Sequence, residues 1–239
     1  MQLLTNRIKN FFLDLFFPKN CLGCKQPGTY LCRDCFNKIP LAENNACFFC
    51  EKITGKGRTC FDCKKEIYLD RVISAAEYKN LLVRELIRAF KYYYVQELSK
   101  PLAQLLINQL RGLELKFNNS EFLIIPIPLH CHRLKYRGFN QAELIAKKMT
   151  DQFNLDIVTD ALERKSPSTP QAKIKDIEKR KLNLQNIFSI KPETAGKIKD
   201  KIILLIDDVI TTGATMNEAA KVLKESGAKE VWALAIAKG

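Results

Sequence analysis

Short runs of aliphatic residues alternate with amphipathic stretches over most of the chain, from Leu69 to the C-terminus. Three runs, residues 72–78, 122–127 and 202–206, have the length and aliphatic content of buried parallel strands. Helical periodicity follows these runs over residues 81–94, 101–110, 141–149 and from Met216 onward. Strands that alternate with helices predict an α/β fold over residues 69–239.

Two acids and a small, hydroxyl-rich turn follow the third run. Asp207 and Asp208 stand at its carboxyl end, where open parallel sheets place their ligands. The turn after them has five small or hydroxyl-bearing residues, Thr211, Thr212, Gly213, Ala214 and Thr215. A turn at a helix N-terminus attracts anions, and carboxylates accept hydrogen bonds from hydroxyls. The segment therefore predicts a sugar-phosphate site.

The alternative for this segment is a strand end with two solvated acids and an ordinary helix cap. A Walker phosphate loop is disfavoured, because its Gly-Lys-Ser/Thr ending is absent. The order of strand, acids, turn and helix favours the sugar-phosphate site over a strand end with solvated acids.

Eight of the nine cysteines lie between residues 21 and 63, as four C-x-x-C pairs. They form two groups of four with metal-ligand spacing: Cys21, Cys24, Cys32 and Cys35, and then Cys47, Cys50, Cys60 and Cys63. Two such pairs complete the tetrahedral shell that Zn²⁺ prefers, and four protein ligands make a site closed and structural. A disulfide framework is the alternative, but a cytosolic chain is kept reduced. We therefore expect two structural zinc ions in residues 21–68, a module that folds only with metal bound.

The way in which the cysteine pairs combine stays open between two arrangements. Neighbouring pairs that share one ion close short loops at low entropic cost, which favours two local quartets. A cross-brace would instead join the first pair to the third and the second to the fourth. The ninth cysteine, Cys131, lies between His130 and His132, whose side chains diverge from it, and we expect a packed thiol there.

Positive charge is the most unusual property of the composition. The formal net charge of +13 favours polyanionic ligands such as pyrophosphate compounds, nucleic acid or acidic membrane surfaces. Residues 164–201 carry eleven Lys or Arg and four Asp or Glu, a net charge of +7, which is over half of the excess. Their first part, residues 164–181, is polar and contains prolines, which predicts a basic loop.

The first 20 residues predict an amphipathic helix that packs on the body of the protein. The apolar run 11–17 is broken by Asp14 and lacks a small-residue cleavage site, which argues against a signal peptide. Contact with a membrane surface is the alternative. No segment approaches the roughly 20 apolar residues that span a bilayer. We expect a cytoplasmic protein without a stable membrane span.

A second polar turn follows residues 122–127 and carries Arg133, Lys135, Arg137 and Gly138. Guanidinium groups at a strand-to-helix junction suit bidentate binding of phosphate. The turn therefore predicts a second anion site beside the first.

Several of these stretches together resemble the ComF/GntX family, which is associated with natural competence. The most specific are residues 137–141, with the sequence RGFNQ, and residues 207–215, with the sequence DDVITTGAT. The cysteine quartets and further matches extend the resemblance over essentially the whole chain: residues 126–130, Phe90, Lys91, Gln171, Arg180, Asn183 and Phe188. The resemblance implies a small zinc-ribbon-like module joined to a doubly wound parallel sheet of the type I phosphoribosyltransferase kind.

By the same resemblance, the site binds phosphoribosyl pyrophosphate. Asp207 and Asp208 form the catalytic pair that holds the ribose 2′ and 3′ hydroxyls, and residues 211–215 hold the 5′-phosphate. Arg133, Arg137 and Lys91 bind the pyrophosphate, with Mg²⁺ bridging it to the ribose. A mobile lid would exclude water from the site, a role that falls to the basic loop with Arg164, Lys165, Gln171 and Arg180. A basic connector without this role is the alternative.

Three functions remain open from the sequence. An enzyme would displace pyrophosphate at the anomeric carbon, but no acceptor pocket is identifiable. A non-catalytic sensor would bind the sugar phosphate while handling single-stranded DNA, with residues 90–94 stacking on bases. Its partners would be single-stranded DNA or a competence helicase. The third function is an inactive scaffold with a relict pocket.

Overall fold

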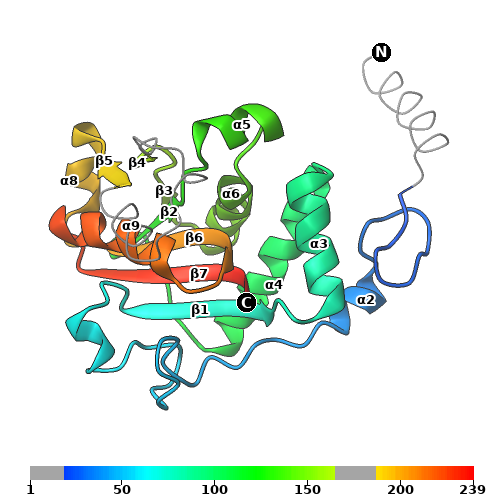
Figure 1. The fold of residues 1–239 in the computed structure, drawn as a ribbon, viewed down its shortest axis with the longest axis horizontal. Helices are drawn as coiled ribbons and strands as arrows, with labels where there is room; N and C mark the ends of the chain where they lie inside the picture. The colour runs from blue at the N-terminus through cyan, green and yellow to red at the C-terminus, as the bar shows by residue number, and fades with distance from the viewer. Residues whose placement is uncertain (1–18, 165–186) are drawn as a thin grey trace, which may run out of the picture.

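A five-stranded parallel sheet forms the centre of the protein, as a computed structural model covering residues 19–164 and 187–239 describes it. The strand order is β1-β7-β6-β2-β3, and every neighbouring pair is parallel (Figure 1). The strands are β1 (Arg71–Glu77), β2 (Phe122–Pro126), β3 (Asp156–Ile157), β6 (Ile202–Ile210) and β7 (Glu230–Lys238). The prediction of an α/β fold with a parallel sheet is confirmed.

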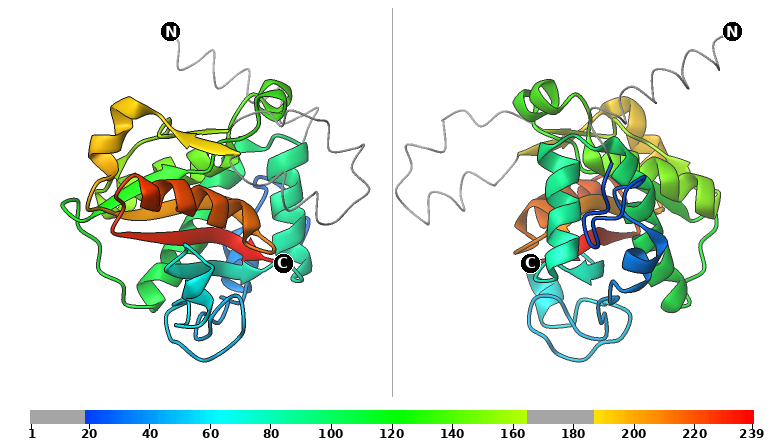
Figure 2. Two further views of the ribbon diagram at one scale, coloured as in Figure 1. Left: turned by 60° about the vertical axis from the view of Figure 1, so that its left-hand side comes forward. Right: turned by 90° about the vertical axis from the view of Figure 1, so that its right-hand side faces the viewer.

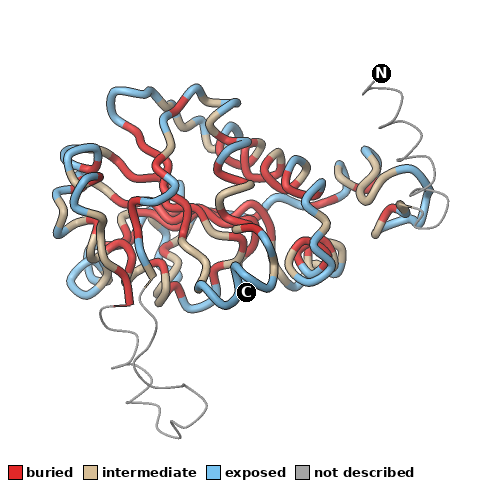
Figure 3. Tube along the Cα trace, turned by 90° about the horizontal axis from the view of Figure 1, so that it is seen from above, coloured by how far each residue is buried: buried red, intermediate tan, exposed pale blue. Residues whose placement is uncertain are grey.

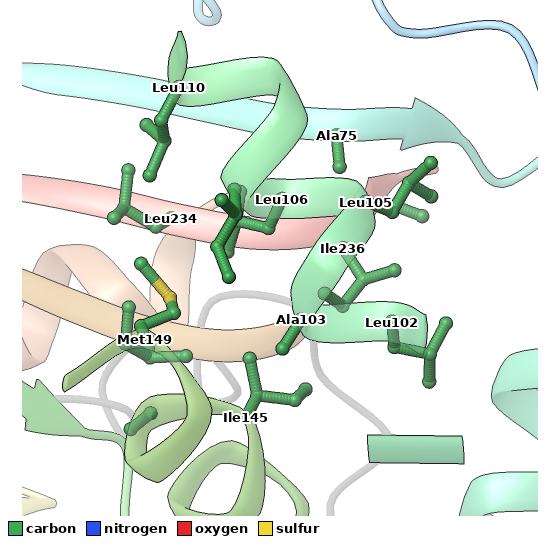
Figure 4. Packing of buried hydrophobic residues seen from close by; sticks show 14 of the residues in the cluster. Ala75, Leu102, Ala103, Leu105, Leu106, Leu110, Ile145, Met149, Leu234 and Ile236 are labelled. Atoms are coloured by element: carbon green, nitrogen blue, oxygen red, sulfur yellow. The ribbon is translucent and has the colours of Figure 1, made fainter. Parts of the chain in front are cut away.

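Alternate residues of the strands point to opposite faces, and each face has its own hydrophobic core. Three helices cover one face: α3 (Leu81–Tyr92), α4 (Ser99–Gly112) and α6 (Gln141–Phe153). Figure 4 shows the α4 leucines packed on Leu234 and Ile236 of β7, with Ile145 and Met149 of α6 beside them. Helix α9 (Ala214–Glu225) covers the other face. The sheet is therefore doubly wound.

A small antiparallel hairpin stands above the second face, formed by β4 (Leu162–Arg164) and β5 (Phe188–Ile190). A 3-10 turn (Pro192–Thr194) and α8 (Ala195–Ile198) lead from it back to the sheet. The two hairpin strands flank residues 165–186, so most of the predicted lid, including Lys165, Gln171 and Arg180, lies outside the described residues. So do residues 1–18 and the predicted N-terminal helix.

Two expectations for residues 131–137 were wrong. The polar turn predicted there is a short helix, α5 (Cys131–Arg137), because His130 caps its start and Gly138, at φ +75°, ends it. Cys131 is exposed rather than packed, because α5 lies on the surface with no buried residue of its own.

The acid pair also lies differently from the prediction, because β6 continues through Asp207 and Asp208 to Ile210. Helix α9 then begins at Ala214. The acids are therefore strand residues, and only Thr211, Thr212 and Gly213 form the connection between strand and helix.

The cysteine-rich segment contains one short helix, α2 (Arg33–Asn37), and a 3-10 turn (Cys63–Lys65). Its first half packs on the α3/α4 face through Leu22, Tyr30, Leu31 and Phe36, and its second half packs on the α9 face through Phe48, Phe49 and Ile67. Figure 2 shows this segment running around the edge of the sheet, and Figure 3 shows the buried residues gathered at the centre of the protein. The two halves therefore straddle β1.

The connection between these halves lies along β1, the edge strand. The Ala42 N–H donates to the Ala75 carbonyl at 2.9 Å, and the Asn44 side chain bonds the Ser74 N–H and carbonyl at 3.0 and 2.9 Å. Further along, the Val72 N–H donates to the Gly57 carbonyl at 2.8 Å. Gly57 has a φ of +68°, and a Cβ there would lie 2.3 Å from the Val72 carbonyl oxygen, so this close approach needs glycine.

Within the described residues, no helix has both the length and the apolar character that a membrane span requires.

Candidate functional site

The carboxyl end of β6 places two acids of different surroundings side by side. Asp208 is buried, and its Oδ1 lies 2.7 Å from Nζ of Lys91, which comes from the last turn of α3. Asp207 is half-buried as a whole residue, but its carboxyl group is enclosed, and its Oδ1 accepts a hydrogen bond from the Asp208 N–H at 2.8 Å. Lys91 therefore compensates one of the two charges where the strand ends.

Asp207 has a raised pKa, so its carboxyl group is only partly ionised at neutral pH. Removal of its carboxyl from water, followed by the neighbouring charge of Asp208, raises the pKa of Asp207 to about 7. The cations Lys91 and Arg164 act in the opposite direction without cancelling this effect. A cation or a hydroxyl donor that binds at Asp207 would stabilise its charged form and lower its pKa. The site therefore favours a ligand that carries such a group.

The turn after β6 forms a small anion-sized hollow. Residues 211–216 line a pocket of about 60 Å³ together with Asp207, Val209 and Ile210. Gly213 precedes α9 with φ +77°, and the Ala214 N–H lies 3.4 Å from Oγ1 of Thr212. The first turn of α9 lines this hollow, and the N–H groups and positive dipole end of a helix N-terminus stabilise a bound phosphate.

Cationic side chains approach the acids from two other elements. Arg133 of α5 and Arg164 of β4 are close enough to act on each other, and Arg164 also acts on Asp207. Burial, and then the Arg133 charge, lower the pKa of Arg164. Burial followed by the charges of His132, Arg164 and Arg133 lowers the pKa of His130. Arg164 therefore lies near both Arg133 and the acid Asp207.

The RGFNQ residues position this region. Gly138 ends α5, and the Phe139 ring packs 5.7 Å from that of Phe90, the neighbour of Lys91. Asn140 caps α6 by accepting from the Ala142 N–H at 3.1 Å, and its amide donates to the Ile127 carbonyl at 2.9 Å. This stretch therefore holds the end of β2, α5 and the end of α3 in one arrangement.

The structure brings most of the predicted site residues together, but not all. Asp207, Asp208, Lys91 and Arg164 lie at the strand end, next to residues 211–215, and Arg133 lies near Arg164. Arg137 instead lies over the ring of Tyr92, with its Cζ 5.4 Å from the ring centroid.

An exposed aromatic and basic surface adjoins these residues. Tyr92, Tyr93 and Tyr136 are 60%, 69% and 80% exposed, and Tyr136 meets Tyr94 edge-on at 6.0 Å. Arg137 over Tyr92 and the exposed Lys135 add positive charge. The sequence indicated only the α3 part of this surface; Tyr136 is added by the position of α5, which no local pattern reveals.

The eight cysteines form two local quartets, so the preferred arrangement is confirmed over the cross-brace. In each quartet the sulfurs lie within 4.8 Å of one another, with contacts of 3.6 Å between Cys24 and Cys32 and 3.4 Å between Cys50 and Cys60. Zn–S bonds of about 2.3 Å in a tetrahedron need sulfurs roughly 3.8 Å apart, so both quartets fit zinc. Burial opposes ionisation of Cys21, but backbone N–H donors led by Cys32 lower its pKa to about 6, whereas the hydrogen bond with the Cys32 thiol, and then burial, raise the pKa of Cys35 to about 12.

Comparison with known proteins extends these observations to the whole chain. Residues 99–239 match the phosphoribosyl transferase domain, and residues 12–67 match the double zinc ribbon domain. Competence protein F of Haemophilus influenzae is 28% identical, over 86% of this chain and 96% of its own length. Competence protein ComFC of Streptococcus pneumoniae is 30% identical over 84% of each chain. DNA utilization protein YhgH of Escherichia coli K12 is 27% identical, over 87% of this chain and 96% of its own. The chain therefore belongs to the ComF/YhgH competence family, in which a double zinc ribbon is joined to a phosphoribosyl transferase domain.

Proposed function

We propose that this protein binds phosphoribosyl pyrophosphate together with Mg²⁺ at the carboxyl end of β6. The observation that supports the proposal is the juxtaposition of an acid pair, a phosphate-sized turn and the nearby cations Lys91 and Arg164 at one strand end. Each part matches one part of the ligand: hydroxyls, a terminal phosphate and a pyrophosphate tail.

In this proposal, Asp207 and Asp208 accept hydrogen bonds from the ribose hydroxyls, and the turn at Thr211, Thr212 and Gly213 donates N–H groups to the 5′-phosphate. Arg133 and Arg164 hold the pyrophosphate, which would relieve the repulsion between their charges. Lys91 lies between the acid pair and the pyrophosphate group. Mg²⁺, when bound, neutralises pyrophosphate oxygens and stabilises charge on the leaving group.

The reaction class that fits this site is pentosyl transfer, in which an acceptor attacks the anomeric carbon and pyrophosphate leaves. The arginines would stabilise the charge that develops on pyrophosphate. We place the activity in the cytoplasm, where cysteine thiols are kept reduced and available to bind zinc.

Titration of phosphoribosyl pyrophosphate with Mg²⁺ tests the site. We expect the Asp207→Ala/Asp208→Ala variant to bind at least 100-fold more weakly than the wild type in calorimetry, because it loses both hydroxyl acceptors. Asp151→Ala, an exposed acid on α6, is the control and should bind normally. Equal or absent binding in wild type and double variant would refute the assignment. Pyrophosphate release with a panel of acceptors then separates an enzyme from a sensor.

A second candidate function is a non-catalytic sensor that also binds single-stranded DNA. The observation that favours it is the exposed surface of Tyr92, Tyr93, Tyr94 and Tyr136 with Arg137 stacked on it. Aromatic rings on a basic surface stack with bases of any sequence. The names of the relatives, competence protein and DNA utilization protein, agree with such a partner.

Removal of this surface should weaken DNA binding while leaving the sugar-phosphate site intact. We expect Tyr92→Ala/Tyr136→Ala to bind an oligothymidylate about tenfold or more weakly, since base stacking contributes about 1–3 kcal/mol per base. Fluorescence anisotropy at several salt concentrations would measure this loss. Tyr68→Ala, an exposed tyrosine of the zinc module, is the matched control. Unchanged affinity in the double variant would exclude this surface as the DNA site.

A further inference from the structure

The second cysteine quartet reaches the phosphate turn through two phenylalanines. Phe48 and Phe49 lie between the quartet members Cys47 and Cys50, and their rings meet edge-on with centroids 5.2 Å apart. Both rings are half-buried and pack against the core of the α9 face. We call the turn from Cys47 to Cys50 the knuckle. When it closes around a metal, the knuckle presents a pair of rings to the transferase domain.

These rings lie directly against Gly213, the last residue of the turn. A Cβ on Gly213 would lie 3.1 Å from Cε1 of Phe49 and 3.4 Å from Cε1 of Phe48. Gly213 is buried although its neighbours Thr211 and Thr212 are exposed, so the rings close one side of the turn while the other side stays open. Gly213 has a φ of +77°. Because glycine has more backbone freedom than any other residue, the contact with the rings restricts the most flexible position of the turn.

Two polar contacts tie the same half of the module to α9. The Tyr68 N–H donates to Oδ1 of Asn217 in the first turn of α9, at 2.8 Å. Asp70, just after the module, pairs with Lys224 near the other end of that helix, at 2.7 Å. The helix that follows the turn is therefore fixed to the chain that leaves the second quartet.

The first quartet has no comparable position among the described residues. Its contacts are with α3 and the segment before α4: Gly23 lies beside Leu82, and Lys19 pairs with Glu97 at 2.6 Å. These elements belong to the opposite face of the sheet. The two quartets therefore differ in what they can influence.

We propose that Phe48 and Phe49 are positioning residues for the phosphate turn, so that metal binding at the second quartet sets the affinity of the turn for a sugar phosphate. The inference rests on the proposed function of the turn. With the knuckle closed, the rings hold Gly213 and present the N–H groups of the α9 N-terminus in one geometry. With the knuckle open, the turn must be ordered by the ligand itself, which weakens binding.

The test compares Phe48→Ala/Phe49→Ala with the wild type, using ribose 5-phosphate as the probe. We expect the double variant to retain two zinc ions per chain and to bind the probe about tenfold more weakly, a change of about 1.4 kcal/mol. The backbone order parameters of Gly213 and Thr212 should also fall before any ligand is added, because the turn loses the contact that holds it. Phe61→Ala is the matched control, because Phe61 lies in the same quartet between Cys60 and Cys63 but is 81% exposed. It should change neither readout.

A second pair of variants separates the two quartets. Cys63→Ser and Cys32→Ser each remove one ligand from one quartet, and zinc analysis verifies that one ion per chain is lost. We expect weakened binding of ribose 5-phosphate and a lowered Gly213 order parameter only for Cys63→Ser. Equal effects of both, or wild-type behaviour of the phenylalanine variant, would overturn the proposal. If the wild type binds no sugar phosphate, the proposed function fails, while the order parameters of Gly213 and Thr212 still decide whether the rings hold the turn.

Discussion

Removal of zinc from the intact protein is expected to unfold residues 19–67 while the parallel sheet persists. The buried hydrophobic residues of this segment are four cysteines together with Ile39 and Ala42. Such a segment has almost no core of its own, and structural zinc contributes on the order of 10–16 kcal/mol to the folding of small zinc modules. By contrast, two hydrophobic cores, one on each face, stabilise the sheet.

Amide hydrogen exchange during chelation would show this separation. Protection should disappear from module amides such as Cys47 and Glu51, whose bonds to Lys52 and Cys47 close the knuckle. Protection should remain in β6 and β7. Added zinc should restore the module, whereas added Mg²⁺ should not. A zinc-free protein whose module amides stay protected would contradict a structural role for the metal.

The Asp207→Asn variant should be more stable than the wild type at alkaline pH. The folded pKa of Asp207, about 7, lies above its ordinary value of 3.8. The native state therefore holds this proton more tightly than the unfolded chain, and the wild type loses stability as pH rises from about 4 to about 7. Asparagine removes the titration. At pH 8 the variant should gain about 2–4 kcal/mol, since one pKa unit corresponds to about 1.4 kcal/mol.

Urea unfolding at pH 5 and pH 8 would measure the gain, which should be clearly larger at pH 8. Asp151→Asn, on the exposed surface of α6, should show no such growth. The same Asp207→Asn variant should bind phosphoribosyl pyrophosphate poorly, so stability and binding would change in opposite directions. A stability difference that is the same at both pH values would disprove the raised pKa.

Features encoded by local spacing were predictable from the sequence. The strand runs, the cysteine quartets and the order of Asp207, Asp208 and the turn each depend on neighbouring residues alone. The contacts between distant segments were not predictable in this way. Nothing in the sequence around Phe48 indicates that it reaches Gly213, and nothing around Tyr136 indicates that it joins Tyr94. The prediction of a packed environment for Cys131 was wrong for the same reason, because the burial of this residue depends on where α5 lies.

The connection that runs along β1 links metal supply to solubility. Backbone groups on the open side of that strand bond to Ala42, Asn44 and Gly57, all of them in the cysteine-rich segment. If this segment unfolds, the sheet keeps its core but exposes a seven-residue edge strand, whose middle carries the apolar side chains of Val72, Ile73, Ala75 and Ala76. Such an edge pairs readily with strands of other molecules. Zinc shortage would therefore act on this protein first through self-association, before the transferase domain itself unfolds.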